Sequence, residues 1–124
     1  RAATIRATSK GLDPVTKKGL LWPYDNWKNR IATLKFVHDI PLKESHESYA
    51  TLISVEDGLS QFIDHPMLIC WGEEDFCFTP NFRKEWSRRF PNAEVHAWAD
   101  VGHYVMEDAT DRLLTEVRRF ISTQ

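Results

Sequence analysis

Hydrophobic residues recur every three or four positions in two stretches of the first half of the chain. The first stretch follows Asp25, whose side-chain oxygen can cap a helix, and it ends before Pro41. The second follows Ser45, another capping residue, and ends before Pro66. The apolar positions are Trp27, Ile31, Leu34 and Val37 in the first stretch and Tyr49, Leu52, Val55, Leu59 and Phe62 in the second. This spacing predicts two helices, each with an apolar face packed against a core.

The pattern changes to that of strands after Pro66. Residues 67–71 form a continuous apolar run closed by Gly72, which is typical of a parallel strand buried on both faces. Residues 94–98 alternate polar and apolar side chains, which is typical of an edge strand. We therefore expect two strands in the second half of the chain.

Helices are predicted after each of these strands. Thr79 offers a capping hydroxyl and Pro80 suits the first helical turn, so a helix is expected from here to Pro91. Asp108 is expected to begin the last helix, where its negative charge would interact favourably with the helix dipole. The apolar positions of that helix are Leu113, Val117, Phe120 and Ile121. Residues 1–23 are mixed and weakly periodic, and no element is predicted there.

The turns after the two strands carry candidate chemistry. A strand, a crossover helix and a second parallel strand form a right-handed unit, and ligands of such sheets gather at the carboxyl ends of the strands. Asp75 lies in the first turn and His103 in the second. A carboxylate on one imidazole nitrogen fixes the tautomer of a histidine that must take and return a proton. Asp75 and His103 are thus a candidate acid and base, and the alternative is that each has an ordinary role in its turn.

These turns also carry motifs that resemble the end of an α/β-hydrolase. The motifs are Gly72-Glu73-Glu74-Asp75 ahead of Pro80, then Gly102-His103 and Glu107-Asp108, at the family's usual interval between acid and histidine. Further segments resemble the haloalkane-dehalogenase branch, and within it most closely the β-lactone decarboxylases of bacterial olefin biosynthesis. They are Pro23-Tyr24, Asn29-Arg30-Ile31-Ala32, Phe36-Val37-His38-Asp39-Ile40-Pro41, Trp71-Gly72, Asp75-Phe76-Cys77-Phe78 and Gly102-His103-Tyr104-Val105-Met106-Glu107-Asp108. The resemblance covers roughly residues 20–121.

The resemblance implies a fold class and a division of the chain. The class is α/β, and the chain would be the C-terminal part of an α/β-hydrolase fold. This part comprises the end of the helical cap, the helices that return to the sheet, the last two parallel strands with their crossover, and the C-terminal helices. Residues 1–23 would be the end of the cap, and residues 24–124 would belong to the core.

The resemblance also implies an activity. An aspartate nucleophile would attack a small hydrophobic substrate, with His103 and Asp75 as the catalytic base and acid. In a β-lactone decarboxylase the ring opens and carbon dioxide leaves, giving an alkene. A haloalkane dehalogenase or an epoxide hydrolase is the alternative within the family, and a non-catalytic α/β module or pseudoenzyme subunit is the alternative of another class.

A nucleophile is missing from this sequence. It contains no Gly-x-Ser-x-Gly or Gly-x-Asp-x-x-Gly turn, so a companion N-terminal segment of the same hydrolase is expected to supply one. Four residues are candidates for lining a tunnel for alkyl chains, although ordinary core roles are the commoner alternative. They are Leu20, Leu21, Trp22 and Phe76.

Composition and charge exclude several other classes. A net charge of −2 comes from 16 basic and 18 acidic residues interspersed along the chain. No cluster of basic residues therefore indicates nucleic-acid binding. No stretch approaches the length of a membrane span, and Cys70 and Cys77 are expected to be reduced thiols of a cytoplasmic protein. The remaining histidines, His38, His46, His65 and His96, lack metal-site spacing. Neither a metal nor a cofactor is implied, and Glu73 and Glu74 are expected to be solvated.

Overall fold

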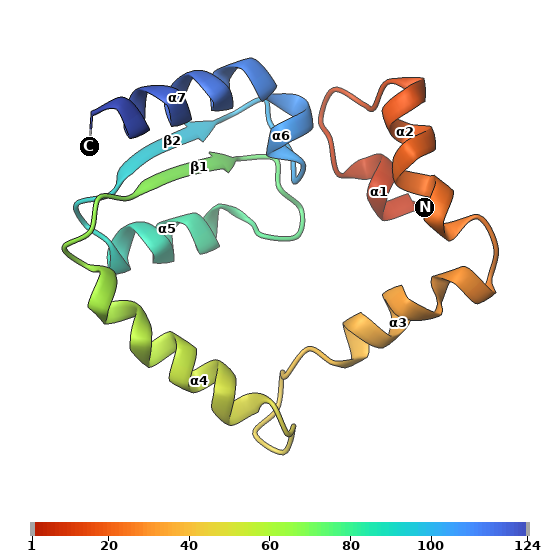
Figure 1. The fold of residues 1–124 in the computed structure, drawn as a ribbon, viewed down its shortest axis with the longest axis horizontal. Coiled ribbons are helices and arrows are strands. Elements are labelled where there is room, and N and C mark those ends of the chain that lie inside the picture. The colour runs from red at the N-terminus through yellow and green to blue at the C-terminus, as the bar shows by residue number, and fades with distance from the viewer. Residues whose placement is uncertain (1, 124) are drawn as a thin grey trace.

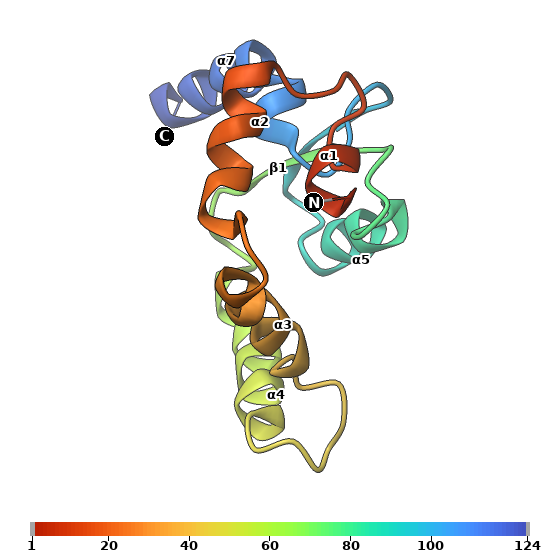
Figure 2. The same ribbon diagram turned by 90° about the vertical axis from the view of Figure 1, so that its right-hand side faces the viewer.

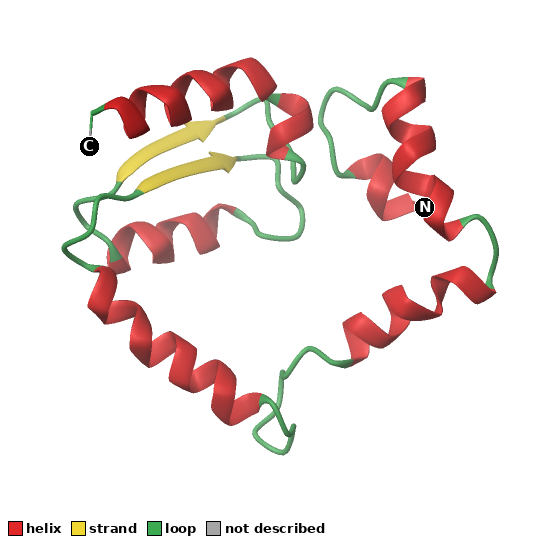
Figure 3. Ribbon diagram, in the orientation of Figure 1, coloured by secondary structure: helices red, strands yellow, loops and turns green. Residues whose placement is uncertain are grey.

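The computed structural model describes residues 2–123, which form a small parallel sheet flanked by helices and a series of further helices that lie away from the sheet (Figures 1 and 3). The α-helices are α1 (Ala2–Arg6), α2 (Pro14–Leu21), α3 (Ile31–His38), α4 (Tyr49–Gly58), α5 (Pro80–Arg89), α6 (Val105–Asp108) and α7 (Thr110–Ser122). Short 3-10 helices are η1 (Trp22–Tyr24), η2 (Lys28–Arg30) and η3 (Leu59–Phe62). The strands are β1 (Leu68–Gly72) and β2 (Glu94–Trp98). The chain is therefore of mixed α and β structure, as predicted.

The two strands pair in parallel, and their register runs from Leu68 opposite Glu94 to Gly72 opposite Trp98. The sheet lies between α5, which connects the strands, and α7 (Figures 1 and 2). This arrangement confirms the predicted order of strand, helix, strand and helix. The expected burial of β1 on both faces is wrong, because Ile69 and Gly72 alone are buried within that strand. In the described chain β1 has β2 as its one neighbour, so its other edge is uncovered.

Helices α1 and α2 occupy the N-terminal stretch in which no element was predicted. Asp13 caps α2, because its Oδ1 accepts hydrogen bonds from the backbone N–H groups of Val15 (2.9 Å) and Thr16 (3.1 Å). Pro14 follows at the first helical position, where its missing N–H costs nothing. A capping residue followed by proline was therefore the sequence signal for α2.

The two helices predicted in the first half are present as α3 and α4, but their predicted caps are wrong. The carboxylate of Asp25 accepts hydrogen bonds from the side-chain amides of Asn26 and Asn29 instead of a helix backbone. Ser48, not Ser45, occupies the position before α4. Both helices therefore begin later than the capping signals suggested.

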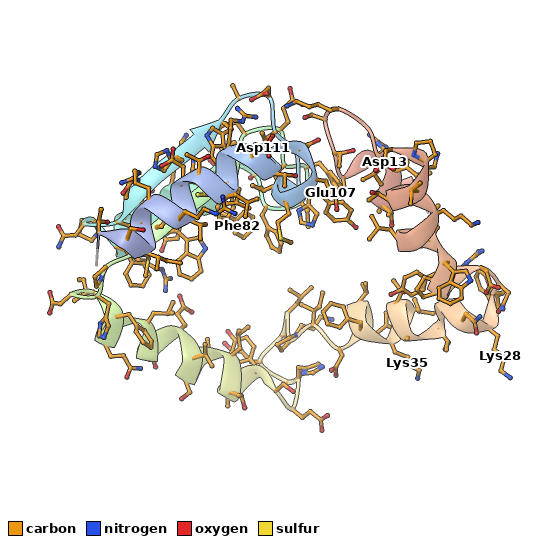
Figure 4. The ribbon with its side chains drawn as sticks, turned by 45° about the horizontal axis from the view of Figure 1, so that its top comes forward. Asp13, Lys28, Lys35, Phe82, Glu107 and Asp111 are labelled. Atoms are coloured by element: carbon orange, nitrogen blue, oxygen red, sulfur yellow. The ribbon has the colours of Figure 1, made fainter. Side chains whose placement is uncertain are left out.

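The apolar faces of α3 and α4 do not pack against a core within residues 2–123. No residue of either helix is buried, and side chains such as Val37 and Val55 are 55% and 59% exposed. The two helices diverge from the loop that joins them (Figure 1) and both project away from the sheet (Figure 2). Lys28 of η2 and Lys35 of α3 point outward from this part of the chain (Figure 4). Both helices carry the expected apolar residues, but residues 2–123 contain no element that covers these apolar faces.

The second half of the chain follows the prediction with two corrections. Thr79 does precede α5, but its hydroxyl makes no capping hydrogen bond. Asp108 does not open the last helix. It ends the short helix α6, Ala109 leaves the helical conformation, and α7 begins at Thr110. No helix among the described residues has the length and apolar character needed to cross a membrane.

Candidate functional site

The candidate site is built where the loops after β1 and β2 meet. The backbone N–H of Glu73 donates to the carbonyl oxygen of Trp98, and that of Glu74 donates to the carbonyl oxygen of Val101, both at 3.0 Å. A Cβ on Gly72 would overlap backbone atoms of Val101 and Gly102. The absence of a side chain at Gly72 therefore allows the two loops to approach closely.

Asp75 is fixed by backbone hydrogen bonds within its own loop. Its Oδ1 accepts from the N–H groups of Cys77 (2.7 Å) and Phe78 (2.8 Å). The residue is 8% exposed. A carboxylate held in this way loses rotamer freedom and keeps its second oxygen, Oδ2, directed elsewhere.

The second oxygen of Asp75 contacts His103. Nδ1 of His103 lies 2.9 Å from Oδ2 and 3.1 Å from Oδ1 of Asp75. An ionised carboxylate accepts hydrogen bonds but cannot donate one, so Nδ1 carries the hydrogen and donates it. In the neutral imidazole the lone pair is then on Nε2, which makes no hydrogen bond to any residue in the range 2–123. The structure thus joins the two predicted residues in the orientation that a proton-accepting histidine requires.

Aromatic rings surround the imidazole of His103. The ring centroids of Phe76, Phe78 and Tyr104 lie 5.8, 5.6 and 5.6 Å from that of His103. Phe82 on α5 packs edge-on against Phe78 at 5.4 Å. The His103 side chain is 26% exposed, so it is accessible from one side while these rings limit its rotation.

A pocket of about 360 Å³ opens beside His103. It is lined by Leu20 of α2 and by residues 103–107, and Glu107 lies on the side of α6 that faces α2 (Figure 4). A larger pocket of about 630 Å³ lies between α2, η1 and α3, and it shares Leu20 and Tyr104 with the smaller one. Its other lining residues are mainly apolar. The two neighbouring pockets therefore extend from His103 to α2, η1 and α3.

The predicted tunnel residues have different locations. Leu20 lines both pockets, and Leu21 lines the larger one. Trp22 is 77% exposed and lines neither pocket, while Phe76 is 56% exposed and contacts the imidazole of His103. None of the four is buried, so none is an ordinary core residue within this structure.

Two acidic residues next to the site differ from expectation. Glu73 is not simply solvated, because its Oε1 accepts a hydrogen bond from Nε of Arg83 on α5 at 2.6 Å. Asp108 does not act on a helix dipole, because its carboxylate accepts hydrogen bonds from the backbone of Ser9 and Gly102, each at 2.8 Å. Glu74 is exposed, as expected.

A second cluster of titratable side chains lies between β2 and α7. Nε2 of His96 is 2.6 Å from Glu94 and 3.4 Å from Glu116, and ligand atoms of the three residues lie within 4.8 Å of one another. Such a set of donors can hold a metal ion. Here Arg119 forms ion pairs with both glutamates, so its guanidinium already balances their charge. Sequence spacing missed the cluster because Glu116 comes from α7.

Comparison with known proteins gives two curated relatives of the same kind. The chain is 43% identical over 121 residues to a cis-3-alkyl-4-alkyloxetan-2-one decarboxylase of Shewanella oneidensis. It is 38% identical over 119 residues to the protein of the same name in Xanthomonas campestris pv. campestris. These matches cover 98% and 96% of the chain, but 38% and 40% of the relatives. No protein-family model matches the chain.

The relatives' name agrees with the resemblance in the sequence motifs, because an oxetan-2-one ring is a β-lactone. The identity extends over nearly all of the chain, whereas the relatives are more than twice as long as the part that is matched. The chain is therefore a homologue of the cis-3-alkyl-4-alkyloxetan-2-one decarboxylases, with a coverage that fits a C-terminal portion of such a protein.

Proposed function

We propose that this chain is the acid- and base-bearing C-terminal part of an α/β-hydrolase that converts a cis-dialkyl β-lactone into an alkene and carbon dioxide. The observation that carries the proposal is the hydrogen bond between Nδ1 of His103 and the carboxylate of Asp75. The homology to decarboxylases of alkyl-substituted oxetan-2-ones supports this choice of substrate.

The proposed reaction balances without water, oxidant or reductant. In the β-lactone ring, the bond between the ring oxygen and the alkyl-bearing carbon breaks, as does the bond from the carbonyl carbon to its ring neighbour. Carbon dioxide leaves and a double bond forms between the two alkyl-bearing carbons. Any proton that Nε2 of His103 takes up must be returned in the same cycle, and an imidazole can accept and donate at one nitrogen. Asp75 would stabilise the imidazolium that forms in between.

The nucleophile would come from outside these 124 residues. Opening the ring through an ester intermediate requires a carboxylate on a sharp turn, and the chain has no such motif. The uncovered edge of β1 and the exposed apolar faces of α3 and α4 support a companion segment, since such surfaces are normally covered. We call this chain together with that N-terminal segment the full protein.

The alkyl groups of the substrate would occupy the two pockets that share Leu20 and Tyr104. The larger pocket is lined mainly by apolar side chains, and the smaller one reaches His103. Residues 1–23, which we assign to the end of a helical cap, contribute Leu20 and Leu21 to this lining. The cap would then select the substrate, while residues 24–124 would hold the catalytic pair.

The test is to assay the full protein with a cis-3,4-dialkyl oxetan-2-one and to measure alkene and carbon dioxide. We expect equal molar amounts of the two products from the wild type and loss of both in His103→Ala. His38→Gln removes an exposed histidine of α3 and serves as the matched control, with activity unchanged. Retention of wild-type turnover by His103→Ala would refute the assignment of the base.

Parallel assays separate the alternatives. Halide release from a 1-haloalkane, or diol formation from an epoxide, in the absence of decarboxylation would replace the β-lactone proposal with a dehalogenase or an epoxide hydrolase. No turnover of any of the three substrates by a folded full protein would favour a non-catalytic module. Intact-mass measurement of the denatured sample establishes beforehand that the nucleophile-bearing segment is present.

A further inference from the structure

The carboxylate of Asp108 gathers donors from two distant parts of the chain. Its Oδ2 accepts hydrogen bonds from the backbone N–H of Ser9 and of Gly102, each at 2.8 Å, and from the Ser9 hydroxyl at 3.2 Å. Its Oδ1 accepts from the N–H of Lys10 at 3.3 Å. Asp108 is 6% exposed, so these donors replace water around the charge.

The groups that Asp108 joins are residues 7–10 and the loop that carries His103. Gly102 directly precedes His103, and the N–H of Tyr104, directly after it, donates to the carbonyl oxygen of Ala7 at 2.7 Å. A Cβ on Gly102 would lie 2.9 Å from that same oxygen and 3.2 Å from Oδ2 of Asp108. The backbone on both sides of His103 is therefore fixed to residues 7–10.

A lysine and a second aspartate reinforce the junction. Nζ of Lys10 donates to the backbone carbonyl oxygen of Asp108 at 3.0 Å and forms an ion pair with Asp100 at 3.2 Å. The single hydroxyl hydrogen of Ser9 is shared between Oδ2 of Asp108 and the backbone carbonyl oxygen of Asp100, which lies 2.6 Å from Oγ. The loop from Asp100 to Tyr104 is thus held at both ends.

We propose that Asp108 is a positioning residue for His103, and that its carboxylate locks the histidine loop onto residues 7–10 so that Nδ1 stays aligned with Asp75. This inference rests on the proposed function, because it assigns Asp108 to the same site. Asp108 lines neither of the two pockets, and none of the hydrogen bonds of its carboxylate goes to the imidazole. It acts through the backbone of Gly102, the residue before the histidine.

The negative charge of Asp108 suits this role better than a neutral side chain. Burial alone would raise its pKa, but the backbone hydrogen bonds from Ser9, Gly102 and Lys10 together outweigh burial and hold the pKa of Asp108 below its usual value. The residue is therefore ionised at neutral pH. All four of its partners are donors, and an ionised carboxylate accepts from each of them.

The experiment compares Asp108→Asn and Asp108→Ala with the wild-type full protein. Asn keeps one acceptor oxygen but places an amide opposite Lys10, whereas Ala removes every bond. Asp111→Asn removes a nearby exposed carboxylate on α7 and is the matched control. We expect kcat to fall by ~10-fold for Asn and ~100-fold for Ala with KM changed by less than about twofold, because displacement of a catalytic group costs rate more than binding.

A readout independent of turnover distinguishes positioning from general support of the fold. The Nδ1 proton of His103 that is bonded to Asp75 should give a downfield proton resonance in the wild type and in Asp111→Asn. In Asp108→Asn we expect this resonance to shift or broaden while urea unfolding shows a folded protein. If Asp108→Asn does not fold, Ser9→Ala takes its place, because it removes the hydroxyl that Asp108 shares with the carbonyl oxygen of Asp100, and it should change the resonance in the same direction.

Two results would overturn the inference. One is a wild-type resonance and wild-type kcat in a folded Asp108→Asn protein. The other is an equal loss in Asp111→Asn, which would show a general effect of charge. If His103→Ala retains turnover, the proposed function fails, but the resonance still decides whether Asp108 aligns the imidazole with Asp75.

Discussion

A side chain on Gly72 would overlap the carbonyl oxygen of Gly102, so these two glycines mark the place where the loops after β1 and β2 touch. The contact involves backbone atoms on both sides, which cannot move aside as the end of a flexible side chain can. Asp75 follows Gly72 by three residues, and His103 follows Gly102 directly. The separation of Asp75 and His103 therefore depends on a contact that tolerates no extra atom.

Gly72→Ala should lower both stability and activity of the full protein. The added methyl group forces the two loops apart, and overpacking of this kind costs about 1–3 kcal/mol. Urea unfolding and the decarboxylation assay measure the two effects. Gly19→Ala is the control, because a Cβ at Gly19 in α2 meets nothing within 4 Å and alanine favours a helix by about 0.5–1 kcal/mol over glycine. Equal stability of the Gly72→Ala and Gly19→Ala proteins would contradict the close contact.

Asp75→Asn should abolish most of the activity while the fold survives. The amide oxygen can still accept from the N–H groups of Cys77 and Phe78, but its NH₂ group then faces Nδ1 of His103 and favours the wrong tautomer. We expect kcat to fall by ~10³- to 10⁴-fold with little change in KM, as for the orienting acid of other triads. Glu74→Gln, the exposed neighbour, should keep wild-type kcat. An active Asp75→Asn protein would remove Asp75 from the mechanism.

Asp100 should give stability that depends on pH. Hydrogen bonds from Arg112 and then Lys10 lower the pKa of Asp100 to about 2 from an ordinary 3.8. A folded-state pKa below the unfolded value stabilises the protein above pH ~4, and this contribution is lost as pH falls toward 2. The urea midpoints of wild type and Asp100→Asn should therefore differ most at pH 6, differ less at pH 3 and converge only as the pH approaches 2. Because Asp100 is exposed, added salt should shrink the difference at pH 6, and a constant gap across this range would argue against the ion pairs.

The two cysteines should differ in their reaction with iodoacetamide. Burial, and secondarily the charge of Glu116, raises the pKa of the Cys70 thiol, which leaves less thiolate at neutral pH. Cys77 is exposed in the loop after Asp75. Mass spectrometry of a time course should find Cys77 modified well before Cys70, and Cys77→Ser should remove the fast phase. Faster modification of Cys70 would contradict its placement in β1.

Leu20→Trp should change the preferred length of the substrate's alkyl groups. Leu20 lines both pockets, so a larger side chain there narrows the passage between them. We expect KM for long-chain β-lactones to rise by ~10-fold or more, with short-chain substrates little affected, because each buried CH₂ contributes about 0.8 kcal/mol. Trp22→Ala at an exposed position that lines neither pocket is the control. An equal effect on short and long substrates would refute the assignment of Leu20 to the alkyl site.

Sequence patterns predicted the sheet and the pairing of Asp75 with His103 for related physical reasons. The apolar run at β1 and the alternation at β2 reflect the two-residue repeat of strands, and the structure confirms both elements within a residue. Asp75 and His103 could be paired in advance because the carboxyl ends of neighbouring parallel strands lie side by side. Their roles in catalysis stay a prediction, which the variants above test.

Other features depended on contacts that no local pattern records. Asp108 looked like a helix-opening residue, yet its partners Ser9 and Lys10 lie near the other end of the chain. Likewise, His96 of β2 lies close to Glu116 of α7, although the two residues are far apart in sequence. The spacing of apolar residues predicted an apolar face on both α3 and α4. Such spacing does not indicate which part of the protein covers the face.

The junction at Asp108 also has a consequence for the order in which the protein folds. Its bond to Ser9 joins residues 99 apart in sequence, whereas the bond between His103 and Asp75 joins residues 28 apart. Closing the longer loop costs about 1 kcal/mol more in chain entropy. Contacts of this kind form late on a folding pathway that begins with local pairing. The strands and the bond between His103 and Asp75 should therefore assemble first, and residues 7–10 should dock last and align a histidine that is already in place.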